Sequence, residues 1–198
     1  TNKFNHYVII ETQGDGRLLN QAIRWEFVNG KNEITLNVRE KAPRISLKDV
    51  GGDLAIGEDG DLIIENGDLK IVTGVDCAKQ LISNCLSLGF GELRHAPFIG
   101  SYFSKYYWEF KDNAFYLNRF LKLEIARLIA IPEFSDDEYS VPTLNFINRV
   151  IDAQVLDCEL INNRIKIKLN LEWGNGEYWE DILNIYIHPK VKNNYCVQ

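Results

Sequence analysis

The chain has 198 residues, of which 45% are hydrophobic and 25% are charged, so it can build a core that depends on neither disulfides nor metals. Its formal net charge is -6 and its basic residues are scattered singly, which argues against a nucleic-acid-binding surface. No apolar run is long enough to span a membrane. We therefore expect neither a nucleic acid nor a membrane as a partner.

The first fifty residues have the pattern of a β-rich region. Apolar runs at residues 6–10, 25–28 and 34–38 predict strands, and Gly14-Asp15-Gly16 predicts a turn between the first two. Pro43 interrupts the pattern, so we place the end of this region near residue 50.

A glycine- and aspartate-rich segment follows between Gly51 and Val72. Three short repeats each begin with an aspartate after a glycine and continue with leucine or isoleucine: Asp53–Ile56, Asp61–Ile64 and Asp68–Ile71. Asn66-Gly67 is a strong hairpin signal, so the segment predicts a β-meander. The aspartates could instead be calcium ligands, but the uneven spacing of the repeats favours turn chemistry.

Two amphipathic segments predict the main helices. The first begins at Thr73 and ends before Gly89, and the second runs from about Asp112 to Ile131. The aromatic segment between them, Tyr102 to Trp108, is assigned to the core in preference to an interface.

The C-terminal part predicts strands. Hydrophobic residues alternate strictly between Arg164 and Trp173, and a last strand lies between Asp181 and His188. The hydrophobic positions of these two strands are Ile165, Ile167, Leu169, Leu171, Leu183, Ile185 and Ile187. The fold class is therefore α+β: an N-terminal β region over residues 1–50, then a small mixed domain over 51–189 with two main helices packed on a C-terminal antiparallel sheet, then a polar tail over 190–198.

The sequence contains no recognisable catalytic or metal-binding motif. Its four cysteines have no C-x-x-C spacing, and its three histidines are far apart. Glu92 is the most suggestive acidic residue, because it lies beside Gly91 and close to Arg94 and His95. Pairing of Glu92 with a neighbouring arginine or with backbone amides is the favoured interpretation. We predict no catalytic residue, no cofactor and no metal.

The stretch from Gly67 to Gly100 resembles the sheath-initiator, or lysozyme-like baseplate wedge, family of contractile phage tails and related injection machines, including type VI secretion baseplates. The residues that carry the resemblance are Gly67, Asp68, Leu69, Val72, Gly74, Asp76, Gln80, Leu86, Gly91, Glu92, Pro97 and Gly100. The stretch covers about a sixth of the chain, and the order of helices and strands extends the resemblance loosely to residue 188.

One position departs from the family's pattern. The family has a Glu-Pro-Arg motif before its C-terminal strands, whereas this chain reads Ile147-Asn148-Arg149, so the arginine alone matches. The resemblance implies that Arg149 makes a buried charge-assisted contact that organises the core or a subunit junction. An ordinary surface arginine before a strand is the alternative.

The resemblance implies a structural role in a virion, with assembly in the host cytoplasm. The chain would nucleate the tail sheath by pairing strand edges with the first sheath ring, and segments Arg164–Trp173 and Asp181–His188 are the candidate edges. The expected partners are the tail sheath protein, other baseplate wedge proteins, the tail tube and further copies of the chain in a ring. The N-terminal region lies outside the resemblance and would be an added docking element. The alternatives are a baseplate-associated peptidoglycan glycosidase acting through paired carboxylates, or a baseplate component of a non-contractile tail.

Overall fold

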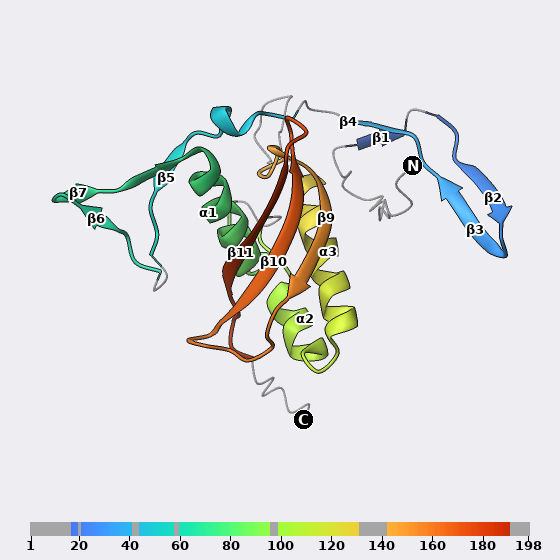
Figure 1. Cartoon of the computed structure of the whole chain (residues 1–198). Helices are drawn as coiled ribbons and strands as arrows, with labels where there is room; N and C mark the ends of the chain where they lie inside the picture. Colours follow the sequence, from blue (N-terminus) through green and yellow to red (C-terminus); the bar gives the residue numbers. More distant parts are fainter. Residues whose placement is uncertain are drawn as a thin grey trace.

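The structure is a computed structural model that describes residues 17–19, 21–40, 44–57, 60–95, 99–130 and 142–190. Six features that the sequence analysis names lie outside these residues: the strand at 6–10, the turn at 14–16, Pro43, Pro97, the C-terminal end of the second helix at Ile131 and the tail beyond residue 190. The described residues form an α+β fold with a central body and two β-arms on opposite sides of it (Figure 1).

The body is built on a three-stranded antiparallel sheet in the order β11-β10-β9. Its strands are β9 (Ile147–Val155), β10 (Arg164–Trp173) and β11 (Tyr178–Tyr186). The bounds of β10 agree with the alternating pattern in the sequence. Strand β9 was not predicted, because its pairing with β10 shifts register near Leu171 and again near Trp173, which interrupts the two-residue period.

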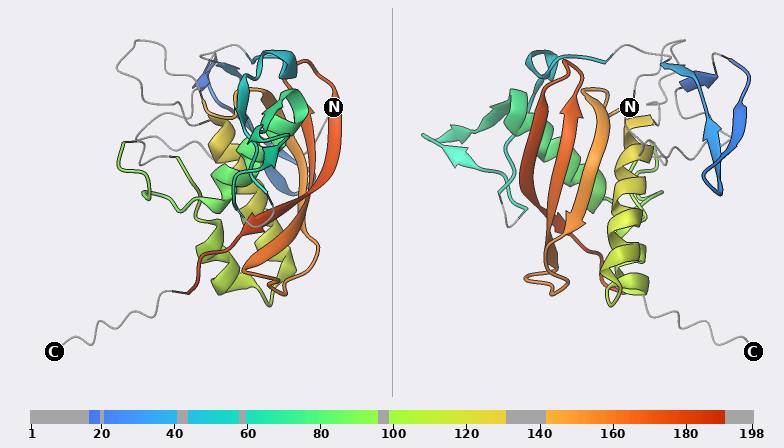
Figure 2. Two further views of the ribbon diagram at one scale, coloured as in Figure 1. Left: turned by 90° about the vertical axis from the view of Figure 1, so that its left-hand side faces the viewer. Right: turned by 45° about the vertical axis from the view of Figure 1, so that its right-hand side comes forward.

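Helices α1 (Gly74–Ser87), α2 (Phe103–Phe110) and α3 (Ala114–Ala130) cover one face of this sheet, and the other face is open (Figure 2). Helices α1 and α3 correspond to the two predicted helices. Helix α2 was not predicted, because its aromatic residues have modest helix propensity. It forms because Phe103 and Tyr107, one turn apart, are both buried against the body.

The core lies between the helices and the inner face of the sheet. Its largest fully buried side chains are Phe103, Phe146, Ile82, Leu86, Leu117, Leu121, Ile125, Ile129, Leu144, Ile147, Ile165 and Ile167. Each buried side chain of this size stabilises the fold by about 1.5–3 kcal/mol relative to its exposed state.

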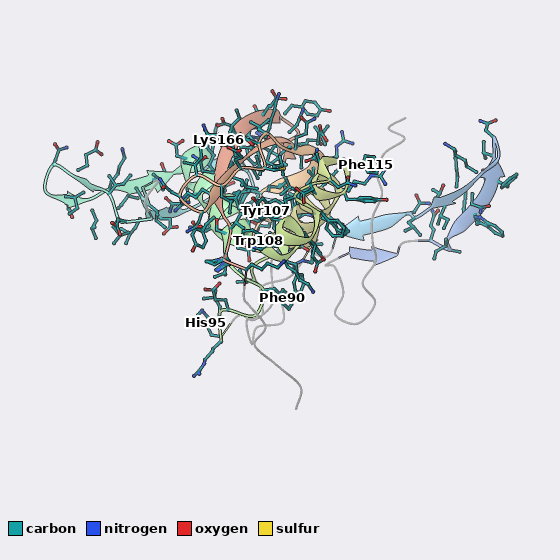
Figure 3. All side chains as sticks on the ribbon, turned by 90° about the horizontal axis from the view of Figure 1, so that it is seen from below. Phe90, His95, Tyr107, Trp108, Phe115 and Lys166 are labelled. Atoms are coloured by element: carbon teal, nitrogen blue, oxygen red, sulfur yellow. The ribbon has the colours of Figure 1, made fainter. Side chains whose placement is uncertain are left out.

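Most of the aromatic segment belongs to this core, as the sequence analysis favoured: Phe103 and Tyr107 are buried and Tyr106 and Trp108 are partly buried, whereas Tyr102 is 38% exposed. The Tyr107 hydroxyl donates to the Cys158 carbonyl oxygen at 2.6 Å, and Trp108 Nε1 donates to the His188 carbonyl oxygen at 2.7 Å. Figure 3 shows both side chains inside the body, whereas Phe115 and Lys166 lie at its periphery. The two polar tips are therefore satisfied within the fold.

Residues 44–50 pack on the body, although the sequence analysis assigned them to the N-terminal region. They include the short 3-10 helix η1 (Leu47–Asp49), and the side chains of Leu47 and Val50 are buried in the core. The fit is close, because a Cβ added to Gly174 would lie 2.5 Å from the Ile45 carbonyl oxygen. Residues 44–50 therefore belong to the body and not to a separate N-terminal region.

Two arms extend from opposite sides of the body (Figure 1). On one side, β1 (Arg17–Leu19) pairs with β4 (Val38–Glu40), and β2 (Arg24–Val28) pairs with β3 (Lys31–Thr35). We call the β2–β3 hairpin the N-terminal arm.

On the other side, residues 52–73 hold four short strands, and we call these residues the acidic arm. The strands are β5 (Gly52–Leu54), β6 (Ile64–Glu65), β7 (Asp68–Leu69) and β8 (Ile71–Thr73). The predicted Asn66-Gly67 turn is confirmed, since both residues have the positive φ of a tight hairpin.

Candidate assembly interface

The hydrophobic side chains predicted at strand edges lie in the core. Ile165, Ile167, Leu169, Leu171, Leu183, Ile185 and Ile187 are all buried on the inner face of the sheet. They hold the sheet on the helices, so a partner could reach these strands through their backbone and not through these side chains.

Strand β10 is not an edge, and this prediction is wrong. It pairs with β11 on one side and with β9 on the other, because a segment distant in sequence occupies its second side. Strand β11 does lie at an edge of the sheet. Trp173 N donates to the Glu177 carbonyl and Ile187 N donates to the Asn163 carbonyl, so Glu177 and Ile187 belong to hydrogen-bonded pairs with the neighbouring strand. In an antiparallel pair every second residue points its amide at the partner strand. Glu180 and Asn184 lie between these positions, so their amides point away from β10.

The opposite edge, β9, is covered by α3. Asn118 Oδ1 accepts from Val155 N at 2.8 Å, and Lys122 Nζ donates to the Ile151 carbonyl oxygen at 2.6 Å. Side chains of a helix therefore satisfy backbone groups that a further strand would need. Helix α1 contacts the C-terminal end of β11 in the same way, since Ser87 Oγ accepts from Tyr186 N at 3.0 Å. The part of β11 around Glu180 is therefore the better candidate for strand addition.

Arg149 lies on the open face of the sheet, in β9. Its Nε donates to Glu172 Oε2 at 2.5 Å across the strand pair, and its Nη2 lies 3.5 Å from the Tyr178 hydroxyl. The hydrogen bond to Glu172 raises the pKa of Arg149. The ion pair is half-buried, and it links all three strands on the open face, so Arg149 is neither a core residue nor an isolated surface arginine.

Glu92 closes the end of α1. Its carboxylate accepts from Gly89 N at 2.8 Å and lies 3.6 Å from His188 Nε2. His188 Nε2 also lies 2.8 Å from the Ser87 carbonyl oxygen, which can only accept, so this nitrogen carries a proton. The preferred interpretation of Glu92, pairing with backbone amides, agrees with this geometry; Arg94 and His95 are in the following loop, and Figure 3 shows His95 directed away from the body.

A buried ion pair on α3 was missed by the sequence analysis. Glu124 is only 1% exposed and accepts from Arg127 Nη2 at 2.7 Å and from Tyr102 N at 3.1 Å. Arg127 also donates to the Gly100 carbonyl oxygen, so the pair fixes the loop before α2. The sequence does carry a signal for this pair: Glu124 and Arg127 are three residues apart within a wide apolar stripe. Side chains with this spacing are neighbours on a helix, so the two charges can pair when the helix is buried.

The N-terminal arm exposes one apolar face. Trp25 and Ile34 face each other across the hairpin and Phe27 follows on the same face, with Trp25 68% and Phe27 71% exposed. Two aromatic side chains carry roughly 150–250 Å² each, so this pair alone leaves about 200–350 Å² of apolar surface in water. The largest apolar patch on a typical monomer is itself about 300–600 Å² and is often functional.

The acidic arm has a second exposed apolar face. Strand pairing and the two-residue period place six exposed hydrophobic side chains on it: Leu54, Ile56, Leu62, Ile64, Leu69 and Ile71. Ile64 and Ile71 are 70% and 65% exposed. Figure 3 shows the side chains of both arms standing clear of the body on its two sides.

Gln80 of α1 anchors the base of the acidic arm. Its Oε1 accepts from Ile56 N at 2.9 Å, and its Nε2 donates to the Leu54 carbonyl oxygen at 2.7 Å and to Asp53 Oδ2 at 3.0 Å. One side chain therefore fixes three groups of the arm. Gln80 is among the residues that carry the family resemblance.

The aspartates of the acidic arm take part in local hydrogen bonds. Asp53 Oδ1 accepts from Leu54 N and Asp68 Oδ1 accepts from Leu69 N, both at 2.8 Å. Among the described residues, no group of three or more potential ligands could hold a metal ion.

Burial raises the pKa of the Cys77 and Cys158 thiols, so both are protonated at neutral pH and are poor nucleophiles.

Comparison of the chain with protein-family models, with curated proteins and with solved structures found no match. In the part of the chain that the structure describes, none of the helices combines the length and hydrophobicity that a membrane crossing requires.

Proposed function

We propose that this chain is a structural component of the baseplate of a contractile tail or a related injection machine, where it nucleates the tail sheath by strand-edge pairing. The observation that carries the proposal is the pair of arms, each of which holds an apolar face in water. A subunit that meets its neighbours through these faces would bury them on assembly.

Two further observations support the proposal. Strand β11 lies at an edge of the body's sheet, where a strand from the sheath protein can be added. The segment that resembles the sheath-initiator family connects the acidic arm, α1 and the loop closed by Glu92, so the resemblance falls on the parts that position the arm on the body.

The test is electron microscopy of particles from a producer that lacks this gene, with plasmid complementation as the control. The proposal predicts naked tail tubes or an absence of sheathed tails, with sheathed tails restored by the plasmid. Normal, contracting tails in the deletion would contradict it, and peptidoglycan cleavage by the purified protein would then favour the glycosidase alternative.

A further inference from the structure

We propose that the N-terminal arm of one copy docks on the acidic arm of a second copy, so that the chain associates head to tail. The inference rests on the proposed role as an assembly subunit and names one of its contacts. It concerns the two exposed apolar faces, and it identifies the occupant of each face as the other arm of a neighbouring copy.

The first argument is that each arm is structurally incomplete. The N-terminal arm is a two-stranded hairpin in which all residues of β2 and β3 except Val28 are exposed. A two-stranded hairpin is marginally stable in water, and further strands or a cover for its apolar face are needed for stability. The acidic arm has the same requirement, because its pairs β5–β8 and β6–β7 are also two-stranded.

The second argument is geometric. The arms lie on opposite sides of the body in Figure 1, and the body separates them in the right view of Figure 2 and in Figure 3. The apolar face of one arm is therefore not covered by the other arm of the same chain. A contact between opposite sides of two copies leaves one arm of each copy available, so the association continues into a ring or a filament.

The third argument is charge. Residues 51–73 contain six Asp and Glu residues and one Lys, so the acidic arm is strongly negative. The β2–β3 hairpin holds two basic and two acidic residues (Arg24, Lys31, Glu26 and Glu33) and is neutral. This charge distribution favours contact of an N-terminal region with an acidic arm over contact between two acidic arms.

The test uses two variants of the full chain that each remove one apolar face. Trp25→Thr/Phe27→Thr alters the N-terminal arm, and Ile64→Thr/Ile71→Thr alters the acidic arm; threonine keeps a high strand propensity. The matched controls change the opposite faces without altering the net charge: Arg24→Thr/Glu26→Thr and Glu65→Thr/Lys70→Thr. Sedimentation velocity measures the oligomeric state.

The inference predicts concentration-dependent oligomers for the wild-type chain and for both controls. Each apolar-face variant alone should associate at least about 30-fold more weakly, as expected on losing central aromatic or aliphatic contacts. An equimolar mixture of the two variants should form a 1:1 dimer that grows no further, because one intact arm of each kind remains.

Three results would overturn the inference: a wild-type chain that stays monomeric up to about 100 μM, self-association of either variant alone that is as strong as that of the wild type, or absence of the dimer from the mixture. Hydrogen exchange of the wild-type chain tests the same contact without any substitution. The backbone amides of both arms should become protected together as the protein concentration rises. A monomeric chain combined with naked tubes in the gene deletion would reject this contact while retaining the proposed function.

Discussion

The side chain of Gln80 donates to Asp53 Oδ2 at 3.0 Å, and this contact joins the helical body to the base of the acidic arm. Gln80 also bonds the backbone of Leu54 and Ile56. An arm with an exposed apolar face can meet a partner in a defined orientation only if its base is fixed. The structure therefore assigns to Gln80 the positioning of the arm relative to α1.

Replacement of Gln80 by alanine should loosen the acidic arm while leaving the body folded. Three hydrogen bonds are lost at a half-buried site, each with a net contribution of about 0.5–1.5 kcal/mol. Hydrogen exchange should become faster over residues 52–73 and stay unchanged in β10. Asn84→Ala, at an exposed position of the same helix, is the control and should change neither. Equal exchange in the two variants would show that Gln80 does not position the arm.

Replacement of Glu124 by alanine should lower the free energy of unfolding by about 3–5 kcal/mol, because it leaves the buried Arg127 without its carboxylate partner. Removing both charges in Glu124→Leu/Arg127→Met should cost less than the single change. Urea denaturation of Glu124→Leu, Arg127→Met and the double variant forms a double-mutant cycle. Additive losses would mean that the pair does not act as a unit.

Gly100 should tolerate alanine less well than Gly91 does. Both have positive φ, but a Cβ on Gly100 would lie 2.7 Å from the Gly89 carbonyl oxygen, whereas a Cβ on Gly91 meets nothing within 4 Å. The two variants share the backbone strain of about 1 kcal/mol, and the clash should add roughly 1–3 kcal/mol at Gly100. Thermal unfolding of Gly100→Ala and Gly91→Ala measures the difference. Equal melting temperatures would show that the loop yields without cost.

The ion pair between Lys79 and Asp181 should make a pH-dependent contribution to stability. Their atoms are 2.5 Å apart, and the hydrogen bond from Lys79 lowers the pKa of Asp181. A lowered pKa in the folded state means that the contribution is present above the unfolded pKa of about 3.9 and is lost as the pH falls through the folded value.

Because the pair is partly exposed, Asp181→Asn should cost no more than about 1 kcal/mol at pH 7. The difference from wild type should disappear as the pH falls through the lowered folded-state pKa of Asp181. Glu180→Gln, which affects the more exposed pair with Lys168, should have a smaller effect. A difference for Asp181→Asn that persists unchanged in acid would show that packing, and not charge, is responsible.

Patterns local in sequence predicted much of the fold. The alternation in β10, the apolar spacing of α1 and α3, and the Asn66-Gly67 turn each report a local geometry, and each is confirmed. The helix α2 was missed because tertiary burial of Phe103 and Tyr107 outweighs the modest propensity of its aromatic residues.

The candidate site was harder to predict, because it depends on which segments become neighbours. The position of β10 in the middle of the sheet follows from its pairing with β9, and no property of residues 164–173 alone reveals it. The same alternation that marks a strand also cannot distinguish the buried Ile167 from the exposed Trp25. That distinction depends on whether the rest of the chain covers the strand.

The most direct test of the central claim is to count sheathed tails by electron microscopy after complementing the gene deletion with a Glu180→Pro variant. Proline removes an amide that points away from β10, so the body should fold while strand addition at β11 is blocked. Glu180→Thr is the control for loss of the side chain. The account predicts few sheathed tails with the proline variant and normal numbers with the threonine variant. Full sheathing by a folded Glu180→Pro protein would contradict sheath nucleation at this edge.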